Sequence, residues 1–124
     1  MESIAYRKEA EMTFGQWGEM KAAEYLQSIG YRVLERNFRC RGGEVDLIVQ
    51  DGSVIVFVEV KARRSLACGA PGLAVTSEKM RKLRVASELY LERKGLRERD
   101  RRMDLVEILH ALGKTSLRHT KGIF

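Results

Sequence analysis

The chain has 124 residues, of which 44% are hydrophobic and 32% charged, a composition typical of a globular protein. Its formal net charge of +6 favours an anionic partner such as nucleic acid, although many basic domains bind nothing specific. No apolar run approaches the ~18 residues that a membrane-spanning helix needs, and residues 1–14 lack the apolar core of a signal peptide. We therefore expect one cytoplasmic domain over residues 1–124, with no membrane partner.

The apolar periodicity predicts two helices and four strands. Helices are expected over residues 15–29 and 77–94, where apolar residues recur at helical spacing. Strands are expected over residues 31–38, 44–49, 54–61 and 103–110, and the tail over 111–124 has room for another short one. The order α-β-β-β-α-β predicts an α/β fold in which helices flank a mixed sheet. The other segments are an N-terminal extension (1–13) and a loop (62–75) with the only proline.

Two of the strands form a hairpin within the stretch GGEVDLIVQDGSVIVFVEVKARR, residues 42–64. The Asp51-Gly52 dipeptide predicts a two-residue turn, in which Val49 pairs with Val54. Because side chains alternate along a strand, one set of polar residues then shares a face at the end away from the turn. This set is Glu44, Asp46, Glu59 and Lys61.

The grouping of these acids predicts a cation site. In the expected register Glu44 is opposite Glu59, and Asp46 is a diagonal neighbour of Glu59, with Cα atoms ~7–8 Å apart. Partly buried carboxylates repel one another unless a cation neutralises them, and hard oxygen ligands favour Mg²⁺ or Mn²⁺. Glu19 lies on the apolar face of the first helix, in line with Ala22 and Leu26, and is expected to point toward the same acids.

Each of these residues also has a structural interpretation. Glu59 and Lys61 could form a solvated ion pair, Glu44 could face solvent, and Glu19 could be satisfied by an arginine. Asp104, isolated among apolar residues of the last strand, is as consistent with an arginine pair as with a site. His110 and His119 are interpreted as structural or surface residues. Cys40 and Cys68 form no CxxC pair, so we expect free thiols and no zinc site.

The residues around the hairpin resemble a known family. The run ERNFRCRGGEVDLIVQDGSVIVFVEVKARRS, residues 35–65, is similar to the uncharacterised bacterial YraN family. The segments GQWGEMKAAEYLQSIGYRVLERN, GAPGLAVTSEKMRKLRVASELYL and MDLVEIL extend the resemblance from Gly15 to about Leu109. That family resembles PD-(D/E)xK nucleases, notably the branch similar to Holliday-junction resolvases, which implies a restriction-endonuclease-like core.

The resemblance implies a role for each acid. Asp46 corresponds to the principal metal ligand, Glu59 and Lys61 to the ExK motif, and Glu19 to the acid of a GxxxE motif that begins at Gly15. This chain departs from the superfamily where Glu44 stands two residues before Asp46, because a proline often precedes the aspartate there. Glu44 is therefore either an additional ligand or a surface residue. The implied cofactor is Mg²⁺ or Mn²⁺, held by Asp46 and Glu59 with support from Glu19.

A nucleic acid would be held through its phosphates by basic residues near these acids. The candidates are Arg39, Arg41, Arg63, Arg64, Lys79, Arg81, Lys82 and Arg84. Residues 93–102 are also basic but carry two acids, so we interpret them as a solvated connection. Aromatic residues are only 7% of the chain and scattered, so no base-stacking platform is expected. The loop over 62–75 follows Lys61 and is expected to border the site.

Three functions remain open on the sequence alone. The first is a metal-dependent nuclease acting on DNA, including branched DNA, and the intact set of Glu19, Asp46, Glu59 and Lys61 favours it. The second is a non-catalytic nucleic-acid-binding module on a nuclease fold, and the third is a structural or interaction domain. Junction resolvases usually act as dimers, so a homodimer is an open expectation, but no dimer surface is identifiable in the sequence.

Overall fold

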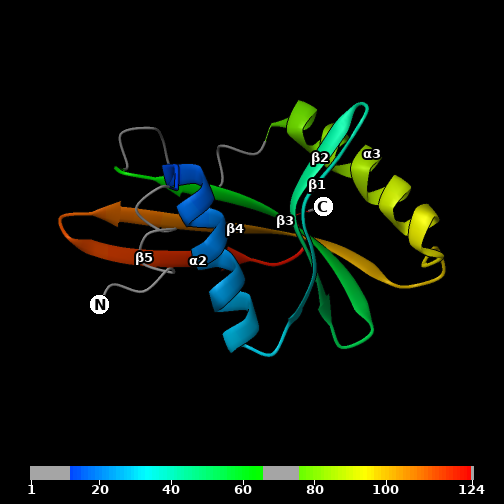
Figure 1. Cartoon of the computed structure of the whole chain (residues 1–124), viewed down its shortest axis with the longest axis horizontal. Coiled ribbons are helices and arrows are strands. Elements are labelled where there is room, and N and C mark those ends of the chain that lie inside the picture. Colours follow the sequence, from blue (N-terminus) through cyan, green and yellow to red (C-terminus); the bar gives the residue numbers. More distant parts are fainter. Residues whose placement is uncertain (1–11, 66–75, 124) are drawn as a thin grey trace.

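The structure is a computed structural model that describes residues 12–65 and 76–123, and Figure 1 shows how the helices and the sheet of these residues are arranged. The helices are α2 (Phe14–Ser28) and α3 (Ser77–Lys94). The strands are β1 (Arg32–Cys40), β2 (Gly43–Asp51), β3 (Val54–Arg63), β4 (Arg101–Ala111) and β5 (Lys114–Thr120). The predicted order α-β-β-β-α-β is confirmed, and β5 is the additional strand for which the tail had room.

The five strands form one mixed sheet in the order β1-β2-β3-β4-β5. Only β3 and β4 run parallel, because α3 and its connections carry the chain back to the starting end of the sheet between them. The other neighbours are antiparallel hairpins. This arrangement is a restriction-endonuclease-like core, in agreement with the fold class expected from the sequence.

Local signals define the ends of both helices. Thr13 is the N-cap of α2, and it forms a capping box with Gln16 through reciprocal hydrogen bonds of 3.0 and 3.1 Å. Thr76 caps α3 by accepting a hydrogen bond of 3.2 Å from the backbone N–H of Lys79. Gly95 ends α3 in a left-handed conformation, with φ of 67°, as is usual for a C-cap glycine.

The helices cover opposite faces of the sheet (Figure 1). Ala22, Ala23 and Leu26 of α2 pack on one face, against alternate residues such as Val56 and Val58 of β3. On the other face, α3 packs against the intervening residues of the same strand. These contacts join Leu83, Ala86, Tyr90 and Leu91 of α3 to Ile55 and Phe57. Because β3 is buried on both faces, it is the central strand from which the candidate site extends.

The predicted register of the β2–β3 hairpin is wrong by two residues. Asp51 pairs with Val54 and Leu47 with Val58, so the turn consists of Gly52 and Ser53. Gly52 has a φ of +60°, which suits glycine at the first position of the turn. A shift of two residues leaves the face of each side chain unchanged. It does, however, remove Glu44 from the position opposite Glu59.

Strict alternation along β2 predicts Val45 on the same face as Leu47, and this is also wrong. Val45 packs in the cluster around α3, whereas Leu47 packs under α2. The β1–β2 ladder contains a register shift between Val33 and Glu35, and Asn37 has a φ of +53°. These irregularities disturb the simple alternation of side chains along the hairpin. The end of β1 and the start of β2 therefore pack on α3 instead of continuing flat alongside β3 (Figure 1).

Two predicted segment boundaries need correction. β3 extends to Arg63, so the first two residues of the expected loop 62–75 belong to a strand. Residues 66–75 lie outside the described residues, as do residues 1–11 of the expected N-terminal extension and Cys68. β4 begins at Arg101, so the expected connection over residues 93–102 includes the start of a strand. Cys40 is a free thiol, as predicted.

Neither helix in the described ranges is both long and apolar enough to cross a bilayer.

Candidate functional site

The predicted acids surround a fork between β2 and β3. The ladder between these strands ends at Leu47 and Val58. Beyond this point β2 remains paired with β1, and β3 remains paired with β4, so the two strands separate (Figure 1). The backbone N–H of Val60 donates a hydrogen bond of 2.8 Å to Oδ2 of Asp46 at this fork. The Asp46 side chain thus takes the place of a strand partner and is held at the opening.

Asp46 is an acid with strongly altered ionisation. Burial, together with the negative charges of Glu59, Glu19 and Glu44, raises the pKa of Asp46 from 3.8 to about 7, against the hydrogen bond from Val60. The three glutamates come from three different elements, α2, β2 and β3. The tertiary structure therefore brings the four predicted acids close enough to interact, and a positive charge near Asp46 would relieve their repulsion.

Glu59 already has a cationic partner. Nζ of Lys79 lies 3.2 Å from Oε1 of Glu59, and the two side chains are 44% and 16% exposed. Lys79 lies in the first turn of α3, where the N-cap Thr76 fixes the start of the helix. A cation that bound Glu59 would have to compete with Lys79. The sequence suggested that Lys79 binds nucleic acid, but it did not suggest this ion pair.

Glu19 reaches the fork from α2. Burial raises the pKa of Glu19, as do the charges of Glu44 and Glu59, whereas a hydrogen bond with Asn37 and the charge of Arg39 oppose the shift. Glu19 lines an open groove of about 430 Å³, together with Gln16 and Met20 of α2 and with Arg36, Asn37 and Leu47. The predicted inward position of Glu19 is thus consistent with a half-buried side chain beside the other acids.

Close packing of two small residues sets the distance of α2 from β3. A Cβ atom added to Gly18 would lie only 2.6 Å from Cβ of Ala62. This contact fixes the turn of α2 next to Glu19 against the end of β3 that carries Glu59 and Lys61. The glycine is therefore needed for approach rather than for its backbone conformation.

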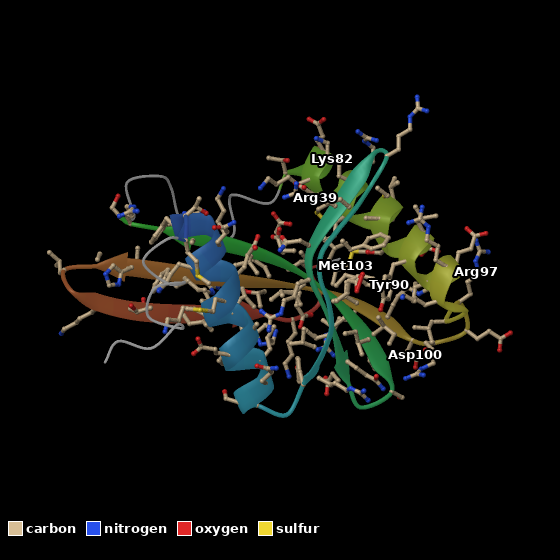
Figure 2. All side chains as sticks on the ribbon, viewed as in Figure 1. Arg39, Lys82, Tyr90, Arg97, Asp100 and Met103 are labelled. Atoms are coloured by element: carbon tan, nitrogen blue, oxygen red, sulfur yellow. The ribbon has the colours of Figure 1, made fainter. Side chains whose placement is uncertain are left out.

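Glu44 lies at the rim of the site. Its side chain is 62% exposed, and Oε2 lies 3.8 Å from Nε of Arg39. Both residues line a second hollow, of about 300 Å³, with Lys82 of α3. Figure 2 shows Arg39 and Lys82 together where the tip of the β1–β2 hairpin meets α3. Gly43 permits this contact, because a Cβ atom there would collide with the backbone oxygen of Lys82. Glu44 acts on Asp46 through its charge while facing solvent.

Lys61 is half-buried on β3 and occupies the register position beside Glu107 of β4. Two residues further on, the guanidinium of Arg63 lies 4.0 Å from the carboxylate of Glu107, and both side chains are buried. Arg63 therefore does not present its charge at the surface in the way that phosphate binding requires. The other proposed basic residues are exposed: Arg39, Arg41, Arg64, Lys79, Arg81, Lys82 and Arg84.

The donor chemistry of the fork fits Mg²⁺ or Mn²⁺, because its carboxylates are hard oxygen ligands and share a partly buried region. The arrangement is not preassembled. Among residues 12–65 and 76–123, no three His, Cys, Asp or Glu side chains are positioned to hold one ion together. Binding would require side-chain movements, including release of Glu59 by Lys79. Asp46 and Glu59 would hold the ion, with Glu19 beside them.

Comparison with known proteins decides the family. Residues 18–108 match the family described as "Uncharacterised protein family UPF0102". The chain belongs to UPF0102. A UPF0102 protein of Symbiobacterium thermophilum is 52% identical over 94 residues, which cover 76% of this chain and 80% of that protein. One from Geobacter sulfurreducens is 49% identical over 94 residues, 76% of this chain and 73% of its own length. One from Geotalea daltonii is 40% identical over 120 residues, which cover 94% of this chain and 93% of that protein.

This UPF0102 chain also contains a polar network that the sequence only partly predicted. Asp104 is fully buried, and Arg102 binds it from Nε at 2.8 Å, which confirms the arginine-pair interpretation. His119 was interpreted as a structural or surface residue, and the structure shows it in a structural role. Its Nε2 lies 2.7 Å from Oδ2 of Asp104, and its Nδ1 lies 3.2 Å from the hydroxyl of Tyr25. The network connects β5 to β4 and α2, so it is a structural feature of the fold.

Two residues near the site were missed in the sequence. Asn37 bonds with Glu19, and its φ of +53° is a conformation that asparagine adopts more readily than most residues. The sequence signal was an asparagine within a predicted strand. The second missed residue is Glu107, which lies beside Lys61 in the sheet. Its signal was a second acid, after Asp104, in the otherwise apolar stretch MDLVEIL.

Proposed function

We propose that this chain is a metal-dependent nuclease that hydrolyses phosphodiester bonds in nucleic acid, with DNA as the favoured substrate. The observation that carries the proposal is the partly buried carboxylate of Asp46. Its pKa is raised to about 7 among three other acids, at a strand fork bordered by exposed cations. Holding acids together in this way is unfavourable for folding, and perturbed ionisation of this kind is common at functional sites.

The acids and the surrounding basic residues have complementary roles in the proposal. Asp46 and Glu59 would hold Mg²⁺ or Mn²⁺, which supplies Lewis-acid activation of water and of the scissile phosphate. Lys61, on the same strand as Glu59, would position the attacking water and stabilise charge that develops on the phosphate. Arg39 and Lys82, side by side at the rim of the site, would bind phosphates of the substrate backbone.

One observation favours a second function, a non-catalytic nucleic-acid-binding module. The ion pair between Lys79 and Glu59 neutralises one of the acids without a metal. A protein that only bound nucleic acid would be stable in this form. The two functions differ in whether Asp46 is needed for bond cleavage, which provides a direct test.

The test is a cleavage assay on plasmid, single strands, flaps and four-way junctions, with Mn²⁺, Mg²⁺ or EDTA. Asp46→Asn is the test variant, since its amide oxygen can still accept the hydrogen bond from Val60. Asp100→Asn is the control, because Asp100 is an exposed acid at the other end of α3 from Lys82 (Figure 2). The nuclease predicts metal-dependent cutting that Asp46→Asn loses and Asp100→Asn retains. Equal cutting by both variants would place the chemistry elsewhere.

Nucleic-acid binding is measured on the same proteins in EDTA. Asp46→Asn is expected to bind DNA as well as wild type or more tightly, because it removes one negative charge from the site. Binding without cleavage on every substrate would favour the non-catalytic module. No salt-dependent binding at all would exclude both functions.

A further inference from the structure

We propose that Phe14, Trp17 and Arg64 form a stacking site for an unpaired nucleobase beside the candidate active site. This inference rests on the proposed function, because it assumes that the ligand is nucleic acid. It also adds to that function, because it assigns a single-stranded segment to the substrate. The sequence predicted no stacking platform, and the fold assembles one from residues 14, 17 and 64.

The rings of Phe14 and Trp17 are nearly parallel. Phe14 and Trp17 are stacked, with centroids 5.4 Å apart and planes inclined by 16°. The guanidinium carbon of Arg64 lies 4.1 Å from the centroid of the Phe14 ring. His110 of β4 meets Trp17 edge-on at 5.5 Å. The near-parallel rings have the orientation in which a nucleobase could extend the column.

All three side chains of the stacking site are at least partly exposed to solvent. Phe14 and Trp17 are both half-buried, at the first two turns of α2. Trp17 packs partly against the core under α2, whereas Phe14 belongs to neither hydrophobic core cluster. Arg64 is exposed, and within the described residues it forms no ion pair. Its planar guanidinium covers one face of the Phe14 ring. If the Arg64 side chain moved aside, a base could stack on that face while the guanidinium contacted a phosphate.

Positively charged side chains lie beside both aromatic rings. Lys21 places its ammonium 6.0 Å from the Trp17 ring, so cations accompany both aromatic residues. A column of aromatic rings with cations alongside is the arrangement by which proteins bind single strands, since bases stack on the rings and phosphates meet the cations. In a duplex the faces of the bases are covered by neighbouring pairs, so such a column selects unpaired bases.

The stacking residues adjoin the candidate site along the chain. Trp17 is two residues from Glu19 on α2, and Arg64 is three residues from Lys61 after β3. The contact between Gly18 and Ala62 holds these two segments together. The stacking residues and the candidate site therefore lie on the same ends of α2 and β3.

The chain supplies its own reporter, because Trp17 is its only tryptophan. Wild-type protein in EDTA, where no metal-dependent cleavage occurs, is titrated with an oligothymidylate of about 12 nucleotides. A duplex of the same length is titrated in parallel. The proposal predicts quenching of tryptophan emission by the single strand and little change with the duplex. Anisotropy of a labelled oligonucleotide gives the affinities independently.

Two substitutions separate stacking from charge. Phe14→Leu is expected to weaken single-strand binding about fivefold or more while leaving duplex binding unchanged, and Phe14→Trp is expected to restore it. Arg64→Ala is compared with Arg118→Ala, which removes an equal charge from an exposed position on β5. Arg64→Ala should weaken single-strand binding more than Arg118→Ala does. Melting temperatures confirm that each variant is folded.

The outcomes distinguish this inference from the proposed nuclease. If Phe14→Leu binds the single strand as wild type does, or if the single strand leaves Trp17 emission unchanged, the stacking site is wrong. Metal-dependent cleavage would still stand in that case. A Phe14→Leu effect confined to the melting temperature also overturns it, because the column would then only fasten α2 to the end of β3. Single-strand quenching without cleavage would support the stacking site and contradict the nuclease.

Discussion

The backbone N–H of Val60 bonds to the carboxylate of Asp46 at 2.8 Å, where β2 and β3 stop pairing. One interaction thus satisfies a backbone donor of the central strand and holds an acid among other acids. The fold is stabilised by the hydrogen bond and destabilised by the charge. This conflict is typical of sites where a ligand is needed to complete the balance of charge.

Asp46→Asn is expected to stabilise the protein in EDTA at neutral and alkaline pH. The pKa of Asp46 is about 7 in the folded state against an ordinary 3.8, so the folded protein binds more protons between these values. The free energy of unfolding of the wild type therefore falls as pH rises from about 4 to about 7. Asparagine stays neutral at every pH. The free energy of unfolding of Asp46→Asn should therefore exceed that of the wild type by about 2–4 kcal/mol above pH ~7.

Urea denaturation of both proteins at about pH 4, 6 and 8 measures this difference. Asp100→Asn, at an exposed position, is the control and should follow the wild type throughout. A stability difference between Asp46→Asn and wild type that did not change with pH would contradict the electrostatic explanation.

Lys79→Ala is expected to increase the affinity for Mn²⁺ about two- to fivefold, because Lys79 competes for Oε1 of Glu59. Isothermal titration calorimetry without nucleic acid measures the dissociation constant directly. Lys82→Ala is the matched control on the same helix, since Nζ of Lys82 lies 3.9 Å from Glu78 instead. Weaker Mn²⁺ binding by Lys79→Ala than by Lys82→Ala would show that Lys79 supports the site rather than competing in it.

Asp104→Asn is expected to lower the free energy of unfolding by about 3 kcal/mol at neutral pH, because it leaves Arg102 without its buried counter-charge. Burial opposes the ionisation of Asp104. Hydrogen bonds from Arg102, His119 and the backbone N–H of Gly122 outweigh it, so the pKa of Asp104 lies below 3.8. This stabilisation is present above pH 3.8 and is lost as pH falls through the folded-state pKa.

Glu88→Gln is the control for Asp104→Asn, because Glu88 pairs with the neighbouring Arg101 at 2.6 Å but is half exposed. Glu88→Gln should lower the free energy of unfolding by less than about 1 kcal/mol. Chemical denaturation at neutral pH ranks the two variants. Similar costs for both would mean that the buried network contributes no more than a surface ion pair.

Gly18→Ala and Gly15→Ala are expected to have opposite effects, although both glycines lie in α2. The new Cβ at position 18 would press on Ala62, so α2 must move away from β3 at a cost of about 1–3 kcal/mol. At position 15 the nearest atom is Oγ1 of Thr13 at 3.9 Å, and alanine there should stabilise the helix by about 0.5–1 kcal/mol. Thermal unfolding measures both. Equal effects would show that helix propensity alone matters.

The local features of the chain were predictable from its sequence. Helical spacing and the alternation in β3 depend on residues near one another, and the structure has the elements they predict. Three acids and a lysine at the end of a hairpin also follow from spacing, because a strand directs alternate side chains to one face. Ile29 shows the limit of periodicity, since it fits the apolar stripe of the first helix but is 44% exposed at the helix end.

The partners of these residues were decided only by tertiary structure. Gly52 and Ser53 form the turn in place of Asp51 and Gly52, because register depends on the packing of both strands as well as on the turn dipeptide. Lys79 reaches Glu59 across 20 residues of chain, and His119 reaches Tyr25 across 94. Phe14 and Arg64 meet because α2 packs closely on β3. Local spacing carries no information about such distant contacts. The sequence by itself therefore determined which residues could form a site, and the fold determined what each of them touches.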